Sequence, residues 1–600
     1  MNILIFSGGT GSVAIQRGLR RTYGDRLDVR IITNTQDNGK STGTVRKVLD
    51  GKINGPSDLR KNQTLRYQLQ GDANKELITL LDIRFDCSSS EAQDYCLSAI
   101  NNCKTLDSLT TSTMIGAVRN YFAFPKSTQV DYVDFSLANI IYAGLAAPNF
   151  SLAEAGKIMA RNVLQIPEDA VLVADDKSLY LQAHTHSGRV IVDEGDIVDW
   201  NNPSDKIIDT FFTDPHGKEA KGELTGECLN AIQDADVIIF SSGTQWSSLI
   251  PTYQHNHFKK AMKDAKAKKY LVVNNVQDKD MAGVGANEML EILGTRFLDL
   301  QTITCIFNQK AMSDMQVDEV FMDAQHWRYL NEDLSLGEFD DKRVHDGSKL
   351  AKLIMFDYYG SKLTNDTFVF DYDDTLVGRN STYHEASKEN KELLMRCSAK
   401  KDISICTGNS IKAINFSDCH FTVPSFTIFA EGGVNRYRLI SDGGGDTFMA
   451  MVRTMSAPEV IAPEFIFTQT EIDLIMSSLE EIGINLSKIQ NRGNAIISIK
   501  PIDPEYRKPL AMLIRLILNK FTVRIAGRTT IDISLGGVKD MILGVIESER
   551  ITVVGDESHE GGNDYSLAIN PRVDFIAVKN PKDTNVFLLT LAMFLGSMRR

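Results

Sequence analysis

Residues 366–376 read Asp-Thr-Phe-Val-Phe-Asp-Tyr-Asp-Asp-Thr-Leu, and this stretch decides the fold of the second half of the chain. The apolar run from Phe368 to Phe370 predicts a buried strand, which delivers two carboxylates two residues apart, Asp371 and Asp373. Alternate residues of a strand point the same way, so this spacing can aim both carboxylates at one metal ion and one phosphate. A carboxylate can attack phosphorus to form an aspartyl-phosphate, and a second carboxyl group can protonate the leaving oxygen.

Further elements suited to phosphate chemistry follow downstream in order. A second apolar strand, predicted at residues 403–406, ends in Thr407, whose hydroxyl can hold a phosphate oxygen. Lys539 follows two glycines and can neutralise phosphate charge. A third strand, predicted at residues 551–554, runs into carboxylates that suit Mg²⁺, an ion that prefers oxygen ligands. These carboxylates are Asp556 and Asp564.

In this order the motifs resemble those of the haloacid dehalogenase superfamily, over roughly residues 367–600. The resemblance implies a Rossmann-like core in which Asp371 is the nucleophile and Asp373 is the general acid and base. Thr407 and Lys539 complete the catalytic set, and Mg²⁺ is the implied cofactor. The metal-binding residues that the resemblance assigns are Asp371, Asp373 (through its carbonyl), Asp556 and Asp564.

The resemblance implies that the long gap between Thr407 and Lys539 holds an inserted α+β cap, at about residues 435–530. Two stretches, residues 492–499 and 527–534, alternate in polarity as strands do. They resemble the cap of sugar-phosphate phosphatases and phosphomannomutases, which typically grips a sugar or a second phosphate. The residues we expect to contact substrate there are Arg492 and Asp532. Hydrolysis and phosphomutation both remain open for this half.

Length, charge and composition exclude several classes of protein. Six hundred residues are too many for one core, so two or more domains are expected. A net charge of −13 argues against a nucleic-acid binder, and no apolar run reaches the roughly 18 residues that cross a bilayer. Met1 to Phe6 predicts a first strand rather than a signal peptide, and the scattered cysteines are typical of reduced thiols. We therefore expect a cytoplasmic protein without nucleic-acid or membrane partners.

Strand-like runs alternate with helical periods along the chain, which predicts α/β architecture. A helix-rich segment is expected at about residues 75–165. A small antiparallel piece is expected at residues 170–200, with Ala170 to Val173 as one of its strands. The domain boundary is predicted near residues 358–367. The buried strands expected in the first half are residues 3–6, 29–33, 237–240, 270–274 and 302–307.

The first predicted strand ends in Ser7-Gly8-Gly9-Thr10-Gly11-Ser12, and a helical stretch follows. A Gly-rich turn between strand and helix exposes backbone N–H groups at the positive end of the helix dipole, which is a ready anion site. Other polar, Gly-rich segments also follow buried strands, where α/β sheets bind phosphates and nucleotides. The candidate binding residues are Gly8, Gly9, Thr10, Gly11, Asp37, Asn38, Ser41, Asp58, Arg60, Asn139, Gly243, Thr244 and Ser248.

In this order, and with a terminal block from His345 to Leu350, these segments resemble the family of 2-phospho-lactate transferases (CofD) and gluconeogenesis factors (YvcK). The resemblance covers about residues 1–355 and implies a Rossmann-like domain. In the transferase branch, a phosphate-linked group passes from a guanosine diphosphate donor to a deazaflavin. In the other branch, a UDP-sugar is bound as a regulatory signal. The chain departs from the family pattern at Asn38, where the family has a second Asp, and at Ala138, where it has Gly.

The two resemblances together predict a bifunctional phosphoryl-handling protein. Residues 1–358 would bind or transfer from a nucleotide or nucleotide-sugar, and residues 367–600 would hydrolyse a small-molecule phosphate ester. Two alternatives stay open: a UDP-sugar-sensing module that gates a phosphatase, favoured by Asn38 and Ala138, and a sugar phosphomutase in the second half. Homo-oligomers formed through the amino-terminal domain are compatible with this prediction.

Overall fold

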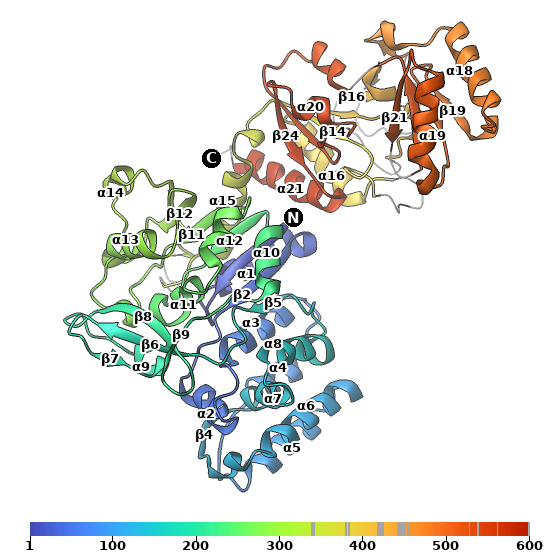
Figure 1. The fold of residues 1–600 in the computed structure, drawn as a ribbon. Helices are drawn as coiled ribbons and strands as arrows, with labels where there is room; N and C mark the ends of the chain where they lie inside the picture. Colours follow the sequence, from blue (N-terminus) through green and yellow to red (C-terminus); the bar gives the residue numbers. More distant parts are fainter. Residues whose placement is uncertain are drawn as a thin grey trace. The chain divides into compact units, whose positions relative to one another are not determined.

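The fold is taken from a computed structural model of the 600-residue chain. The structure describes residues 1–337, 343–378, 381, 385–416, 425–440, 452, 457–526, 529–536, 539–560 and 562–597. The chain divides into two compact units, unit 1 (Met1–Ile354, blue to green in Figure 1) and unit 2 (Met355–Arg600, yellow to red). Each unit is described by itself.

Unit 1 is built on a seven-stranded sheet of order β13-β12-β11-β10-β1-β2-β5, in which all neighbouring strands run parallel. The central strands are almost wholly buried and apolar, as expected for a covered parallel sheet. Register pairs Ser7 with Thr33 and Phe6 with Phe240, so β1, β2 and β10 end at one edge. The strands are β1 (Asn2–Ser7), β2 (Asp28–Thr33), β5 (Val171–Val173), β10 (Val237–Phe240), β11 (Lys268–Val272), β12 (Ile303–Asn308) and β13 (Tyr329–Glu332).

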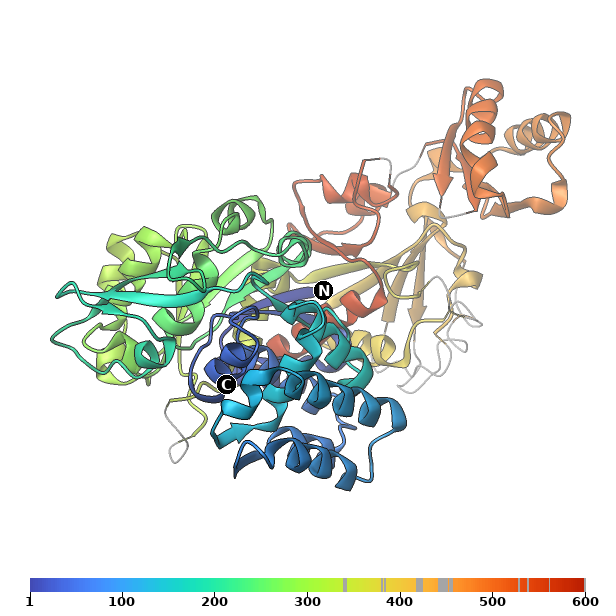
Figure 2. The same cartoon turned by 60° about the horizontal axis from the view of Figure 1, so that its bottom comes forward.

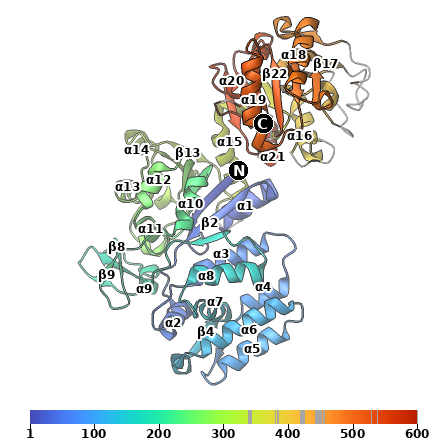
Figure 3. The ribbon, with the colours of Figure 1, turned by 45° about the vertical axis from the view of Figure 1, so that its right-hand side comes forward.

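Helices surround this sheet; α6 packs against both α5 and α7, and α7 also packs against α8 (Figure 3). The helices of the first part are α1 (Val13–Tyr23), α2 (Lys40–Val48), α3 (Ser57–Gln68), α4 (Lys75–Leu81), α5 (Ala92–Asn102), α6 (Ser108–Phe122), α7 (Leu137–Ala146) and α8 (Leu152–Ile158). Those of the second part are α9 (Glu194–Val198), α10 (Gly226–Asp234), α11 (Ile250–Tyr253), α12 (Phe258–Asp264), α13 (Ala286–Arg296), α14 (Glu319–Ala324) and α15 (Gly347–Tyr359). Among the helices of the described residues, none has both the length and the apolar character needed to cross a membrane.

Two smaller antiparallel sheets complete unit 1. One has four strands in the order β7-β6-β8-β9, and the other pairs β3 with β4 inside the helix-rich segment. The strands are β3 (Arg84–Cys87), β4 (Tyr132–Ser136), β6 (Tyr180–Thr185), β7 (Val190–Ile191), β8 (Ile207–Thr213) and β9 (Glu219–Ala220). The prediction that Ala170 to Val173 belongs to the antiparallel piece is wrong, because β5 pairs in parallel with β2. Its wholly buried, apolar run suits a covered parallel strand rather than a half-exposed one.

Unit 2 is built on a second seven-stranded sheet, of order β18-β17-β16-β15-β14-β23-β24. The five strands from β16 to β24 in this order are parallel, and β17 and β18 add antiparallel at one edge. Register pairs Asp371 with Cys406 and Phe370 with Val554. The chain segments that carry Asp371, Thr407 and Asp556 therefore leave the sheet at one edge. The strands are β14 (Thr367–Asp371), β15 (Asp402–Cys406), β16 (Ser425–Ala430), β17 (Asn435–Ile440), β18 (Glu459–Val460), β23 (Ile551–Gly555) and β24 (Val573–Ala577).

A separate four-stranded antiparallel sheet, of order β19-β20-β22-β21, lies with α18 and α19 in the part of unit 2 drawn in orange in Figure 2. We call Gln469–Ser534 the insert. Isoleucines from one face of its sheet share a core with Ile475 of α18 and Ile514 of α19. The insert elements are α18 (Gln469–Glu481), β19 (Ile489–Arg492), β20 (Ile496–Ile499), α19 (Pro504–Ile517), β21 (Thr522–Ala526) and β22 (Thr530–Ser534). The remaining helices of unit 2 are α16 (Lys388–Ser398), α20 (Tyr565–Ala568) and α21 (Pro581–Ser597).

The α/β class expected from the sequence is confirmed, with differences in detail. The insert begins later than residue 435, because β17 and β18 pair with the large sheet, and it runs on to Ser534. Residues 492–499 form two strands rather than one. Gly493 and Asn494 have positive φ angles of 57° and 58°, and such a pair favours a turn between antiparallel strands. Residues 527–528 and Gly537 lie outside the described residues.

Candidate functional site

In unit 2, charged side chains meet beyond the ends of β14 and β23. Asp371, Asp556 and Asp564 each offer a carboxylate oxygen, and these oxygens lie within 4.8 Å of one another. The Nζ atom of Lys539 lies 2.6 Å from Oδ1 of Asp371 and 2.7 Å from Oδ1 of Asp564. Lys539 also donates to Oδ1 of Asn563 at 3.2 Å. The fold thus brings together four residues that the sequence nominated from separate segments.

Burial sets the electrostatics of this cluster. It raises the pKa of Asp371 well above its usual range, an effect that Lys539 opposes and that the charges of Asp564 and Asp373 reinforce. Burial works against the charge of Lys539, but Asp371 and Asp564 raise its pKa well above the usual value. Burial and the charges of Asp564 and Glu557 raise the pKa of Asp556 to about 6. Three carboxylates thus face one ammonium group, and this all-oxygen, negatively charged donor set fits Mg²⁺.

Asp373 lies beside this cluster and is held by a different partner. Nδ2 of Asn409 donates to Oδ2 of Asp373 at 2.6 Å, and the backbone N–H of Asn409 donates to Oγ1 of Thr407 at 3.0 Å. Thr407 follows β15 directly and is fully buried. Asn409 is not among the residues predicted from the sequence, although its place right after Thr407-Gly408 is a signal for it.

The predicted substrate residues of the insert lie on β19 and β22. Nη1 of Arg492 donates to the carbonyl of Gly408 at 3.1 Å, which brings Arg492 to the loop after β15. Asp532 instead accepts a hydrogen bond from the hydroxyl of Ser498 at 2.6 Å. Lys500, just after β20, was not foreseen. Burial and the like charge of Arg492 lower its pKa, while Asp532 and Asp373 oppose that shift, so Lys500 lies near all three.

Unit 1 carries a cavity of about 1370 Å³ at the edge where β1, β2 and β10 end. The predicted residues that line it are Gly8, Gly9, Thr10, Gly11, Asp37, Asn38, Ser41, Asp58, Asn139, Gly243, Thr244 and Ser248. Arg60 is not among the described residues that line the cavity, whereas Lys61 is. Residues three apart share one face of a helix, so Asp58 and Lys61 of α3 point into the cavity together and Arg60 does not.

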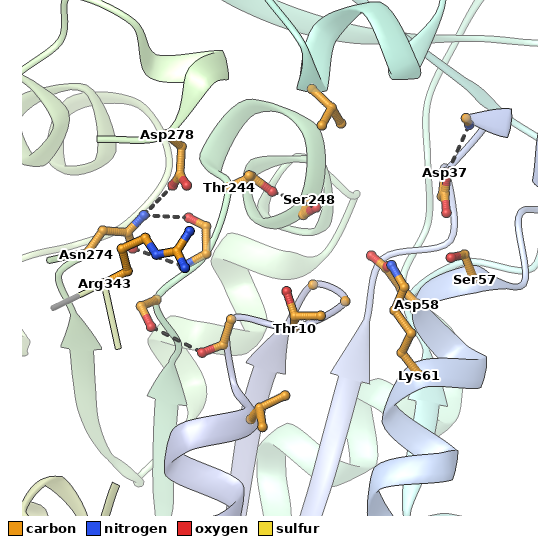
Figure 4. Close-up of a pocket in the computed structure, with 18 of the residues that line it drawn as sticks. Thr10, Asp37, Ser57, Asp58, Lys61, Thr244, Ser248, Asn274, Asp278 and Arg343 are labelled. Carbon is orange, nitrogen blue, oxygen red and sulfur yellow. Dashed lines mark hydrogen bonds and ion pairs between the residues drawn. The ribbon is translucent and has the colours of Figure 1, made fainter. Parts of the chain in front are cut away.

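The Gly-rich turn after β1 leaves little room for a side chain at Gly8, Gly9 or Gly11. A methyl group at Gly9 would lie 2.6 Å from Oδ1 of Asp58 and 2.8 Å from Nζ of Lys61. Behind the turn, buried Asn62 donates to the carbonyl of Gly8 at 2.8 Å. Figure 4 shows Thr10 of this turn between the Asp58–Lys61 pair and the loop that carries Thr244. The backbone of the turn can therefore approach a ligand closely.

A second turn, after β10, faces the first. Gly243 has a φ of +152°, a conformation that favours glycine. Asn274 fixes its peptide groups, since Oδ1 accepts from the N–H of Gly243 at 2.9 Å and Nδ2 donates to its carbonyl at 3.0 Å. The hydroxyl of Thr244 donates to that of Ser248 at 2.9 Å. Asn274, Asp278 and Arg343 also line the cavity (Figure 4), and the sequence analysis foresaw none of them.

Carboxylates form one wall of the cavity. Burial and the charge of Asp37 raise the pKa of Asp58 to about 6 against the opposing effect of Lys61. Glu194, from α9, accepts the backbone N–H of Asn38 at 3.2 Å, and burial and the charge of Asp37 raise its pKa well above the usual value. The amide of Asn38 donates to Oδ2 of Asp193 at 3.3 Å. A carboxylate at position 38 would meet like charges here, which gives a physical reason for the departure from the family pattern.

Comparison with known proteins finds a family and several similar proteins. A family model described as 2-phospho-L-lactate transferase CofD matches residues 3–332. A putative gluconeogenesis factor from Thermotoga maritima is 25% identical over 370 residues, which cover 59% of this chain and 98% of that protein. A crystal structure of a UPF0052 family member from Bacillus halodurans is 22% identical with a TM-score of 0.45, covering 59% of this chain and 98% of that one. An N-terminally truncated, IMP-bound IMP-nucleotidase from Plasmodium falciparum is 14% identical with a TM-score of 0.29, covering 41% and 73%.

Proposed function

Since the chain belongs to the family of 2-phospho-L-lactate transferase CofD, we propose that unit 1 binds a nucleotide or nucleotide-sugar and that unit 2 hydrolyses a phosphomonoester. The observation that carries the second part is the cluster of Asp371, Asp556 and Asp564 around Lys539. It combines a buried carboxylate nucleophile, a cation in direct contact with it and an oxygen donor set for Mg²⁺ at one sheet edge.

The residues supply the steps of hydrolysis. A carboxylate oxygen of Asp371 attacks phosphorus, and the bond from phosphorus to the leaving oxygen breaks. Asp373 gives its proton to that oxygen and later takes a proton from the water that cleaves the aspartyl-phosphate. Lys539 contacts Asp371 at 2.6 Å, and its positive charge favours the ionised form of the nucleophile against the effect of burial. Mg²⁺ held by Asp371, Asp556 and Asp564 would neutralise charge on the phosphate oxygens.

The insert supports a substrate with a polar or anionic leaving group. Arg492 and Lys500 bring two positive charges near Asp373, and Ser498 and Asp532 add hydrogen-bonding groups on the same sheet. A sugar phosphate or a small phosphorylated acid matches this chemistry. Phosphomutation uses the same groups and differs by returning the phosphate to a second hydroxyl of the sugar.

The test of the second part is hydrolysis of p-nitrophenyl phosphate by the full chain with Mg²⁺. We expect Asp371→Asn to reduce kcat by about 10⁴-fold or more, because it removes the nucleophile and a metal ligand together. A chelator should abolish activity. The control is Asp366→Asn, which changes an exposed side chain just before β14, paired with Lys401, and should keep full activity. Undiminished turnover by the Asp371 variant would refute the assignment.

For unit 1, the cavity supports a ligand of nucleotide size or larger, because its volume exceeds the roughly 300–1,000 Å³ of ordinary small-molecule sites. The engagement of Asn38 by Asp193 favours the regulatory alternative, in which unit 1 binds a UDP-sugar without transferring a group. Thermal shifts of the full chain with GDP, UDP and UDP-sugars test this part. A ligand at about 100 times its Kd adds about 2.7 kcal/mol of stability. Turnover of the nucleotide by the Asp371→Asn chain would instead show that unit 1 is catalytic.

A further inference from the structure

The loop after β15 holds the acid–base residue of the proposed hydrolysis at a fixed point. Asn409 is bound through three groups. Its side-chain Nδ2 donates to Oδ2 of Asp373 at 2.6 Å, and its backbone N–H donates to Oγ1 of Thr407 at 3.0 Å. Its carbonyl accepts the backbone N–H of Glu431 at 2.9 Å. An amide with both backbone groups bound is a rigid donor, so the contact to Asp373 is built into the fold.

The same loop is supported from two directions. From the large sheet, the N–H of Gly432 donates to the carbonyl of Thr407 at 3.0 Å. From the insert, Nη1 of Arg492 donates to the carbonyl of Gly408 at 3.1 Å. Glu431, which binds the carbonyl of Asn409, has a positive φ of 53° and a carboxylate that accepts from Asn435 at 3.2 Å. Each of these contacts holds the backbone of the loop from which the Asn409 side chain reaches Asp373.

We propose that Asn409 is a positioning residue for Asp373. This inference rests on the proposed phosphatase function of unit 2. The amide N–H holds one carboxyl oxygen and so fixes the plane of the carboxyl group next to Asp371. In the first step the phosphorus–Asp371 bond forms and the bond to the leaving oxygen breaks, while the Asp373 proton passes to that oxygen. Removing Asn409 takes the donor away from Oδ2, which loosens the plane of the carboxyl group and misplaces the proton at the moment of cleavage.

This role has a signature that a general loss of structure lacks. The alkoxide of an alkyl phosphate such as glycerol 2-phosphate is a poor leaving group and needs the proton. The phenolate of p-nitrophenyl phosphate is stable and leaves without it. Asn409→Ala should therefore lower kcat/KM for glycerol 2-phosphate by about 10²-fold, the usual cost of misplacing a reacting group by about 1 Å. The same variant should lower kcat/KM for p-nitrophenyl phosphate less than about threefold.

Matched variants separate positioning from folding. Asn409→Asp has the same shape but lacks the donor, so it should lose glycerol 2-phosphate turnover at least as strongly as Asn409→Ala. Asn409→Gln keeps an amide donor and should regain part of it. Ser410→Ala, the neighbouring loop residue without a side-chain capping bond, should retain the wild-type rates on both substrates. Thermal unfolding of each full-length variant checks the fold.

The outcomes are distinct. A selective loss on glycerol 2-phosphate supports the inference. Equal losses on both substrates, or none in Asn409→Ala and Asn409→Asp, overturn it while leaving the phosphatase function intact. A wild-type chain that hydrolyses neither substrate with Mg²⁺ overturns the proposed function and this inference with it.

Discussion

The charged centre of unit 2 and the cavity of unit 1 use similar residue types in opposite ways. In unit 2, Lys539 contacts two carboxylates at 2.6 and 2.7 Å, and all three side chains are almost completely buried. In unit 1, Lys61 lies 3.5 Å from Asp58, and its side chain is 39% exposed to an open cavity. The first arrangement suits covalent chemistry on a small group, because its charges are fixed. The second suits a large ligand, which can replace solvent around flexible side chains and bare glycine backbone.

The largest effect should come from breaking the buried pair. Lys539→Met leaves Asp371 and Asp564 without their cation, and we expect unit 2 to lose about 3–5 kcal/mol of stability in the presence of a chelator. Lys61→Met is the matched change in unit 1 and should cost less, because the Lys61 side chain is 39% exposed and its contact with Asp58 is longer, at 3.5 Å. Hydrogen exchange, read from peptides of each unit during urea titration, measures both. Equal losses of stability in Lys539→Met and Lys61→Met would contradict the proposed difference between the two ion pairs.

The next effect concerns the glycine turn of unit 1. Gly9→Val places a branched side chain against Asp58 and Lys61, so nucleotide affinity should fall tenfold or more, which is about 1.4 kcal/mol. Gly116→Ala, on α6 in open space, should leave affinity unchanged. Calorimetry with GDP and with a UDP-sugar measures each. Identical affinities in wild type and Gly9→Val would exclude the turn from the binding site.

The smallest effect is the coupling between the two units. If unit 1 is a sensor, a nucleotide-sugar that binds it should change the rate of p-nitrophenyl phosphate hydrolysis about fivefold or more, the lower end of usual coupling energies. Gly9→Val should lose this response and keep the basal rate. A rate that is indifferent to every nucleotide that binds would show that the two units act independently.

The sequence predicted the centre of unit 2 more completely than the cavity of unit 1. Asp371 is the last residue of an apolar strand, and Thr407 and Asp556 each follow one directly, so strand ends alone bring them to one edge. Glu194 and Arg343 line the cavity but belong to segments far from the Gly-rich turn in sequence. No local sequence pattern predicts that they do so. Lys61 rather than Arg60 faces the cavity because of the rotational position of each residue on α3. That position depends on where the helix begins.

The fold shows the same limit. The apolar run of β5 was recognised as a strand, but its parallel pairing with β2 depends on a partner more than a hundred residues away. The late start of the insert follows from the pairing of β17 with β16, which polarity patterns do not encode. Local sequence patterns thus predicted which segments are strands, whereas the sheet to which each strand belongs was known only from the tertiary structure.

The most direct test of the account is to look for phosphate on Asp371. The full chain is mixed with Mg²⁺ and p-nitrophenyl phosphate, quenched in acid during turnover, and digested for mass spectrometry. The account predicts a phosphoryl group on the peptide that contains Asp371, at that residue, and its loss together with turnover in Asp371→Asn. Continued hydrolysis by Asp371→Asn, or wild-type turnover with phosphate on another residue, would contradict it.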